Sequence, residues 1–188
     1  HAAKNLTVIH ESILDFDASV LPKNYKVIAN IPYYLTSHLA RIMLESSNPP
    51  SEMVLLVQKE VAQRIAAEPG QMGILSVTSQ FYAQITLYQE VPAHLFTPPP
   101  KVDSQIVQLS YRSTPLFNDI TPELFFKLVK AGFSEKRKKL RSSLSGALGR
   151  SKPEIDKLLT SAQIDQNARA QELTLKEWHR LYKAFQKR

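Results

Sequence analysis

The segment from residue 26 to residue 33 reads KVIANIPY, and the fold can be worked out from it. Residues 26–31 form an apolar run typical of a strand, and Pro32 ends that strand because proline lacks the N–H that a ladder hydrogen bond needs. Residues 36–46 have apolar side chains at helical spacing. Residues 53–58 (MVLLVQ) read as a second strand, and their unbroken apolar run predicts burial on both faces. Strands separated by a helix predict a parallel or mixed sheet with helices on its faces.

The predicted secondary structure changes after Arg112, from strands and helices to helices alone. Before it, residues 59–67 and 74–82 favour helices, residues 85–91 and 104–111 favour a closing antiparallel pair of strands, and residues 6–9 read as one more short strand. After it, helices are predicted over residues 121–131, 135–148, 153–162 and 174–186. We therefore expect an α/β part over residues 1–112 and a small all-α domain over residues 113–188.

Composition excludes several classes of protein. Hydrophobic residues make up 43% of the 188 residues and charged residues 22%, which excludes a disordered or fibrous chain. Because the chain has no cysteine, disulfides, thiolate zinc sites and cysteine nucleophiles are excluded. No apolar run approaches the ~20 residues of a membrane helix. None of the five glycines lies in the first 69 residues, so no glycine-rich phosphate loop can lie there.

The positive charge lies in the second part of the chain. Residues 1–112 carry 8 Lys and Arg against 9 Asp and Glu, a net charge of −1, and residues 113–188 carry 16 against 8, a net charge of +8. This asymmetry favours an anionic partner for the second part, although solvated lysine-rich helix faces would have the same composition.

The clearest candidate for chemistry is the run Asn30-Ile31-Pro32-Tyr33 at the carboxyl end of a strand, the edge at which α/β sheets bind ligands. An amide side chain and a neighbouring carbonyl can accept hydrogen bonds from an exocyclic amine, and a tyrosine can stack on a flat base. A strand end with a proline turn and a half-buried tyrosine is the simpler interpretation of these four residues.

A second candidate is a basic block on the predicted helix over residues 135–148, made of Lys136, Arg137, Lys138, Lys139 and Arg141. Arg137 and Arg141 would share one helix face, and Phe133, Leu140 and Leu144 could anchor the opposite side. Backbone phosphates are its natural partner, and a solvated helix is the alternative.

The histidines do not indicate a metal site, because His10, His38, His94 and His179 lack the spacing of metal ligands. We interpret them as structural or surface residues and expect no metal site. Trp178 lies among apolar residues at helical spacing and is expected to pack inside the helical domain.

Four blocks in the same order resemble the ribosomal RNA adenine dimethyltransferases of the small-subunit branch. They are Asn30–Tyr33, Val57–Val61 with Arg64, Phe96–Ser104, and Phe133–Arg141. The resemblance implies an incomplete Rossmann-like methyltransferase sheet, its carboxyl-terminal half, over residues 1–112, followed by a basic helical RNA-binding domain. For Gln58, Lys59, Glu60 and Arg64 we expect sheet-edge and helix-cap roles.

The resemblance also implies an activity. Members of this family transfer methyl groups from S-adenosylmethionine to the exocyclic amine of adenines in a ribosomal RNA hairpin, after the base has left its stack. Asn30 and the backbone of Ile31 and Pro32 would hold the amine, Tyr33 would stack on one face of the ring, and Phe96 would close the other face. Lys136, Arg137, Lys138, Lys139 and Arg141 would bind the RNA.

The cofactor site implied by the family is incomplete in this sequence. The family's glycine-rich loop has no counterpart, and Ser12, with Glu11 beside it, stands where an acidic residue usually contacts the cofactor's adenine. Either residue could make that contact. We expect the chain to be the carboxyl-terminal portion of such an enzyme, by truncation, proteolysis or nature, and to bind S-adenosylmethionine only weakly and be inactive alone.

Two functions remain open at this point. The first is an adenine dimethyltransferase that acts in small-subunit maturation on ribosomal RNA or a pre-small-subunit particle, and the second is a non-catalytic nucleic-acid-binding or transcription-factor-like protein on the same scaffold. In both we expect a cytoplasmic monomer with no membrane partner.

Overall fold

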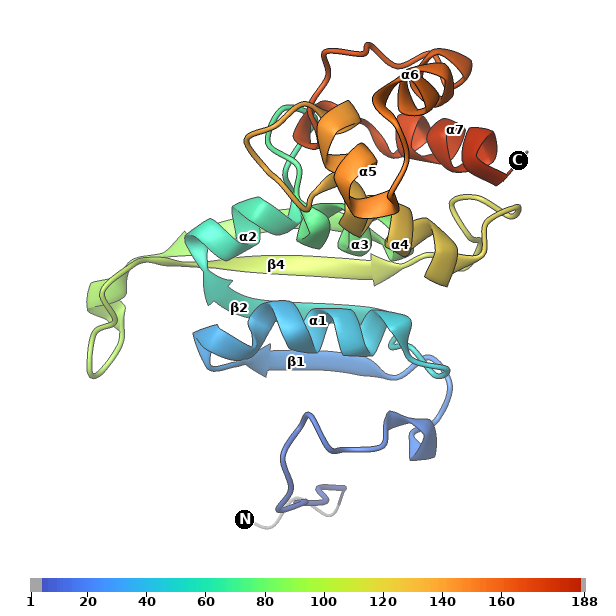
Figure 1. Ribbon diagram of the computed structural model, residues 1–188. Coiled ribbons are helices and arrows are strands. Elements are labelled where there is room, and N and C mark those ends of the chain that lie inside the picture. The colour runs from blue at the N-terminus through green and yellow to red at the C-terminus, as the bar shows by residue number, and fades with distance from the viewer. Residues whose placement is uncertain (1–4, 187–188) are drawn as a thin grey trace.

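The computed structural model describes residues 5–186 except for the side chain of Tyr33, and its centre is a four-stranded mixed sheet (Figure 1). The strand order is β1 (Lys26–Asn30), β2 (Glu52–Gln58), β4 (Ser104–Tyr111) and β3 (Ala83–Val91). β1 and β2 are parallel, whereas β4 is antiparallel to both of its neighbours. The predicted α/β class, the mixed sheet and the closing antiparallel pair are therefore confirmed.

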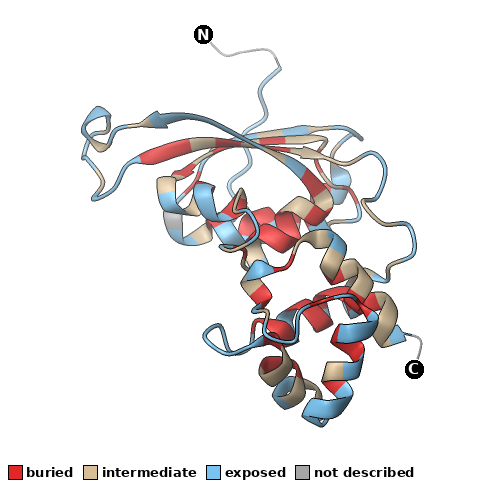
Figure 2. Ribbon diagram, turned by 90° about the horizontal axis from the view of Figure 1, so that it is seen from above, coloured by how far each residue is buried: buried red, intermediate tan, exposed pale blue. Residues whose placement is uncertain are grey.

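The α-helices of the first part cover one face of this sheet. α1 (Thr36–Glu45), α2 (Lys59–Ile65) and α3 (Ile74–Tyr82) lie on the same side of the strands (Figure 2). Their apolar side chains pack against inward-facing residues such as Leu55 and Val107, both fully buried. The expectation that residues 53–58 are buried on both faces is wrong. Burial alternates along β2, because no α-helix of the described residues covers the opposite face.

The second part is a helical bundle with its own core. It contains α4 (Pro122–Gly132), α5 (Leu140–Leu148), α6 (Lys152–Ser161) and α7 (Leu175–Gln186). α6 begins with a capping box in which the Ser151 N–H donates to Glu154 Oε2 at 2.9 Å, and Gly149, with φ +64°, caps the carboxyl end of α5. Trp178 is completely buried among these helices, as its position in the sequence predicts.

The two hydrophobic cores meet at α3. Val77 and Phe81 pack with the core of the helical part, whereas Leu75 packs against the core beneath the sheet. Tyr82, at the end of the same helix, is packed against both cores. We retain the division at residue 112 as a proposal for the domain boundary, with α3 as the element that joins the two parts.

Two predicted elements differ from those that the described residues form. Residues 6–9 form no strand and are exposed, because no described strand lies beside them to complete a ladder. The helix predicted over residues 135–148 begins only at Leu140, after a series of turns over residues 133–138. The N–H of Leu140 donates to the carbonyl of Ala168 at 2.8 Å, so a tertiary contact fixes where α5 begins.

Candidate functional site

Two of the sequence blocks form the walls of a single open pocket of about 330 Å³. The turn after β1 contributes Asn30, Ile31 and Pro32, and the loop between β3 and β4 contributes Phe96, Thr97, Pro98 and Pro100. These segments are distant in the sequence. They meet because β4 lies next to β2, and β2 lies next to β1. The structure thus brings together Phe96 and the first three residues of the Asn30–Tyr33 motif.

The turn after β1 presents hydrogen-bonding groups to this pocket. Asn30 is the last residue of β1 and is exposed, and its amide has no hydrogen-bond partner among the described residues. Ile31, only 8% exposed, anchors the turn in the core. The Pro32 carbonyl accepts the Leu35 N–H at 2.9 Å, which leaves its second lone pair for another donor.

Tyr33 opens the short 3-10 helix η2 (Tyr33–Leu35). Its side chain lies outside the described residues, so its stacking on a base stays a prediction. Phe96, on the facing wall, is half-buried, and a ring there can lie against a flat ligand.

Asp103 fixes the loop that carries Phe96. Its Oδ1 accepts the N–H of Ala93 at 2.9 Å, and its carbonyl accepts the N–H of Lys59 at 3.0 Å. The Lys59 ammonium in turn lies 2.9 Å from Glu90 on β3, and this hydrogen-bonded carboxylate raises the pKa of Lys59. Sequence reasoning gave Asp103 no role, although the residue stands three positions after Pro100, the last of the triple-proline stretch.

Glu11 and Ser12 are not part of this pocket. Both are exposed, and Ser12 closes a local turn in which its hydroxyl accepts the Leu14 N–H at 3.3 Å and its carbonyl accepts the Asp15 N–H at 3.0 Å. Of the residues expected to contact S-adenosylmethionine, only Asn30 therefore lines the pocket. The donor set that the described residues present does not make a complete site for this cofactor.

Four of the five cations of the basic block, Lys136 to Lys139, lie on a loop, and Arg141 alone lies on α5. Arg137 and Arg141 consequently do not share a helix face, and that expectation is wrong, although Phe133, Leu140 and Leu144 are buried as expected. Five closely spaced cations would repel one another in a continuous helix, which disfavours that conformation. The chain instead turns through this segment, with the Lys138 N–H donating to the Glu135 carbonyl at 2.9 Å.

The five cations of the block have different surroundings. Arg141 pairs with Asp156 at 2.7 Å and joins α5 to α6, Lys138 pairs with Glu135, and Lys139 donates to Asn167 Oδ1 at 2.7 Å. Lys136 and Arg137 have no such partner within residues 5–186. These two cations are the most available for an external anion.

Histidines and acidic residues form no metal site within the described part of the chain. His179 has a structural environment, since its ring stacks on Phe117 with centroids 4.1 Å apart and its Nε2 lies 2.7 Å from Asp119 Oδ1. The described helices also include none that is long and apolar enough to span a bilayer.

Comparison with known proteins identifies the family. A family model described as ribosomal RNA adenine dimethylase matches residues 1–187. A ribosomal RNA small subunit methyltransferase A from Dehalococcoides mccartyi is 43% identical over 180 residues, which cover 94% of this chain and 62% of that protein. The chain thus spans less than two thirds of the length of this relative.

Two solved structures share the fold. A dimethyladenosine transferase from Plasmodium falciparum has a TM-score of 0.80 and 24% identity. The match covers 99% of this chain and 74% of the Plasmodium chain. The 23S rRNA methyltransferase ErmE has a TM-score of 0.72 and 22% identity. The match covers 95% of this chain and 71% of the ErmE chain. At these identities the likeness concerns the fold alone, and it supports the Rossmann-like assignment. The family model and the relative from Dehalococcoides mccartyi show that the chain belongs to the ribosomal RNA adenine dimethylase family.

Proposed function

We propose that the protein containing this chain dimethylates the exocyclic amine of adenines in a small-subunit ribosomal RNA hairpin, with S-adenosylmethionine as methyl donor, during ribosome maturation. The observation that supports this most directly is the shared pocket of Asn30, Pro32 and Phe96. Membership of the family and the relative from Dehalococcoides mccartyi supply the reaction and the class of RNA.

The pocket has groups suited to the acceptor side of this reaction. The amine of adenine is a poor nucleophile because its lone pair is conjugated with the ring. Asn30 Oδ1 and the free lone pair of the Pro32 carbonyl would accept its two N–H bonds and draw the nitrogen towards tetrahedral geometry. The ring of Phe96 would hold the extruded base by one face. The contribution of the chain is then positioning and preorganised acceptors, with no covalent intermediate.

Replacement of Asn30 tests the proposal. In the complete protein, Asn30→Ala should lower the rate of methyl transfer by about 10²–10³-fold, the loss typical of one preorganised polar contact, while RNA affinity remains. Asn118→Ala removes an exposed amide elsewhere and serves as the matched control. Near-normal methyl transfer by Asn30→Ala would overturn the proposed role. RNA affinity without any methyl transfer by the unaltered protein would indicate a non-catalytic RNA-binding protein.

Cofactor binding is expected to require more than the described residues provide, because Glu11 and Ser12 lie apart from the pocket. Isothermal titration of this chain with S-adenosylmethionine should show no tight binding. A dissociation constant in the micromolar range would contradict this expectation.

The basic loop of residues 133–139 is proposed to bind RNA phosphates, together with Arg141. Lys136 and Arg137 should contribute most, because their charges are not paired within the described residues. Lys136→Ala with Arg137→Ala should reduce the slope of log affinity against log salt by about 1 per residue. Arg141→Ala is expected to act mainly on stability, since Arg141 joins α5 to α6.

A further inference from the structure

Exposed apolar side chains adjoin both walls of the pocket proposed to hold the target base, which we call the base pocket. Each stands within two residues, along the sequence, of a side chain that lines this pocket: Tyr34 follows Pro32, Leu95 precedes Phe96, and Val102 follows Pro100. Their exposed fractions are 84%, 66% and 45% in that order. Single exposed apolar residues are common on protein surfaces, but three of them around one pocket indicate a contact surface. We call these three the mouth residues.

The backbone holds two of the mouth residues in place. Tyr34 is the middle residue of η2, which is closed by the Leu35 N–H donating to the Pro32 carbonyl at 2.9 Å. Leu95 lies in a second 3-10 turn, where its own N–H donates to the Pro92 carbonyl at 3.1 Å. A side chain on a fixed turn loses less conformational freedom when a ligand binds, so these positions are preorganised for contact.

Tyr34 contributes little to the folded core. It is the most exposed of the tyrosines whose side chains the structure describes, and the next, Tyr88, is 48% exposed and donates its hydroxyl to Gln108 at 2.6 Å. The Tyr34 hydroxyl has no hydrogen-bond partner within the described residues. Because this ring neither packs nor bonds within the described chain, its faces are available to a flat ligand.

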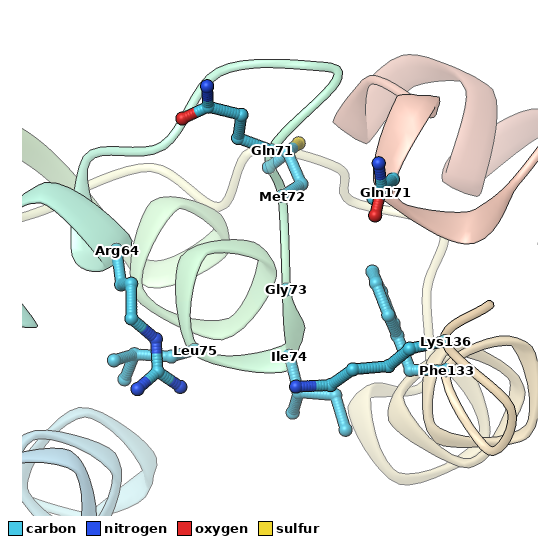
Figure 3. A pocket seen from close by; sticks show the side chains of 9 residues that line it. All are labelled: Arg64, Gln71, Met72, Gly73, Ile74, Leu75, Phe133, Lys136 and Gln171. Atoms are coloured by element: carbon cyan, nitrogen blue, oxygen red, sulfur yellow. The ribbon is translucent and has the colours of Figure 1, made fainter.

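The base pocket offers apolar surface and hydrogen-bond acceptors, and not charge. The described residues that line it include no charged side chain. By contrast, the pocket of about 340 Å³ between the two parts of the molecule is lined by Arg64 and Lys136, which approach Ile74 from opposite sides (Figure 3). Phosphates are bound by cations, whereas an aromatic and apolar mouth fits the faces of unstacked bases.

Extrusion of an adenine leaves its neighbours in the RNA without one of their stacking partners. An exposed aromatic ring beside the base pocket can take the place of the missing base. Stacking on an aromatic side chain strengthens the binding of a single-stranded base by roughly 5- to 150-fold. Such a contact would act on the entry of the target into the pocket and not on the transfer of the methyl group.

We propose that Tyr34 stacks on a base adjacent to the target adenine, while Leu95 and Val102 contact the nucleotide on the other side of the target. This inference rests on the proposed function, because it takes an extruded adenine as the occupant of the base pocket. Tyr34 is then a positioning residue, which holds the neighbouring nucleotide and does not touch the reacting amine.

The first test measures binding and turnover of the complete protein with a hairpin of small-subunit ribosomal RNA. Tyr34→Ala should weaken the affinity for the hairpin and raise the KM for RNA by at least about 5-fold, with a much smaller change in kcat. The slope of log affinity against log salt should stay the same, since no phosphate contact is lost. Tyr34→Phe should keep most of the affinity, because the ring remains. Val20→Ala changes an apolar residue that is 72% exposed and lies outside the mouth, and should leave the affinity unchanged.

A fluorescent base reports the contact directly. 2-Aminopurine, whose emission is quenched by stacking, replaces in turn the nucleotide on each side of the target adenine. At one of these two positions, the complex with Tyr34→Ala should be brighter than the complexes with the unaltered protein and with Tyr34→Phe. Equal emission from all three complexes at both positions would overturn the stacking role.

The other outcomes separate this inference from the proposed function. If the unaltered protein does not bind the hairpin, RNA as the partner and the role of Tyr34 are both overturned. If it binds and methylates the hairpin, the role of Tyr34 alone is overturned when Tyr34→Ala keeps the original affinity, or when Tyr34→Phe or Val20→Ala loses as much as Tyr34→Ala. A lowered midpoint of thermal unfolding in Tyr34→Ala would also overturn it, because the ring would then pack within the protein.

Discussion

The helical part of the molecule encloses its core, whereas the sheet is covered on one face only. Trp178 and Phe125 are completely buried within the bundle of α4 to α7. On the open face of the sheet Ile28 is 84% exposed, although Leu55 on the other face is fully buried. The candidate base pocket lies at the edge of the half-covered sheet. Local hydrogen bonds, such as those of Asp103, hold the loop that forms one wall, and the buried Ile31 anchors the other wall in the core.

The largest effect is expected at the centre of the helical core. Trp178→Ala should lower the free energy of unfolding by about 3–5 kcal/mol, because a fully buried ring is replaced by a cavity. Urea unfolding followed by circular dichroism measures this loss. Leu124→Ala, at a position on α4 that is 45% exposed, is the control and should cost much less. Equal losses would show that the helical core is not the main source of stability.

Two glycine substitutions test how tightly the helical part is packed around Trp178. A Cβ at Gly132 would lie 2.5 Å from Trp178 Cη2, so Gly132→Ala should destabilise the fold by about 1–3 kcal/mol through overpacking. Gly146, inside α5, has nothing closer than 4.0 Å to an added Cβ, and Gly146→Ala should stabilise by about 0.5–1 kcal/mol. Because Trp178 is the single tryptophan, its fluorescence reports unfolding of the helical part in both variants.

Acid should loosen the segment that connects the two parts. Hydrogen bonds from Lys183 and His179 on α7 lower the pKa of Asp119 from 3.8 to about 2. Since the folded-state pKa is the lower one, the carboxylate stabilises the fold above pH 3.8, and this contribution is lost as the pH falls through about 2.

Asp119→Asn removes this pH dependence. The difference in stability between the unaltered protein and the variant should be largest near neutral pH and should shrink on acidification, as measured by thermal unfolding at a series of pH values. Asp15→Asn, at an exposed position, should show no such trend. A difference that stays constant down to pH 2 would contradict the ion-pair account.

The smallest effect is expected on the open face of the sheet. Ile28→Thr replaces one β-branched residue by another at a position that is 84% exposed, so the free energy of unfolding should change by no more than about 0.5 kcal/mol. Thermal unfolding of this variant beside Leu55→Ala, which should cost about 2–5 kcal/mol, compares the two faces directly. A large loss from Ile28→Thr would mean that this face is covered in solution.

Helix and strand positions were largely predictable where local signals and burial agree. Residues 74–82 and 104–111 form the predicted helix and strand, and Pro122 lies in the first turn of α4, as prolines of that kind do. The basic segment was mispredicted, because its residues favour a helix locally while repulsion and the contact of Leu140 with Ala168 place the start of the helix later.

In the candidate site, too, short motifs could be identified from the sequence, whereas contacts between distant segments could not. The sequence identified the turn at Asn30 and the proline loop at Phe96, and family resemblance related them to one reaction. The sequence could not show that Asp103 holds the loop by accepting the Ala93 N–H, or that Ser12 closes an exposed turn away from the pocket.

By itself, the sequence determined the α/β class, most of the secondary structure, the family and the accumulation of positive charge in the last 76 residues, because each depends on composition, periodicity or short motifs. Only the tertiary structure decided which side chains meet. Strand order brings Phe96 to the Asn30 turn, and the packing of α2 and α3 beside the basic loop brings Arg64 into one groove with Lys136. Such contacts join residues that are far apart along the chain, and no local pattern encodes their distance.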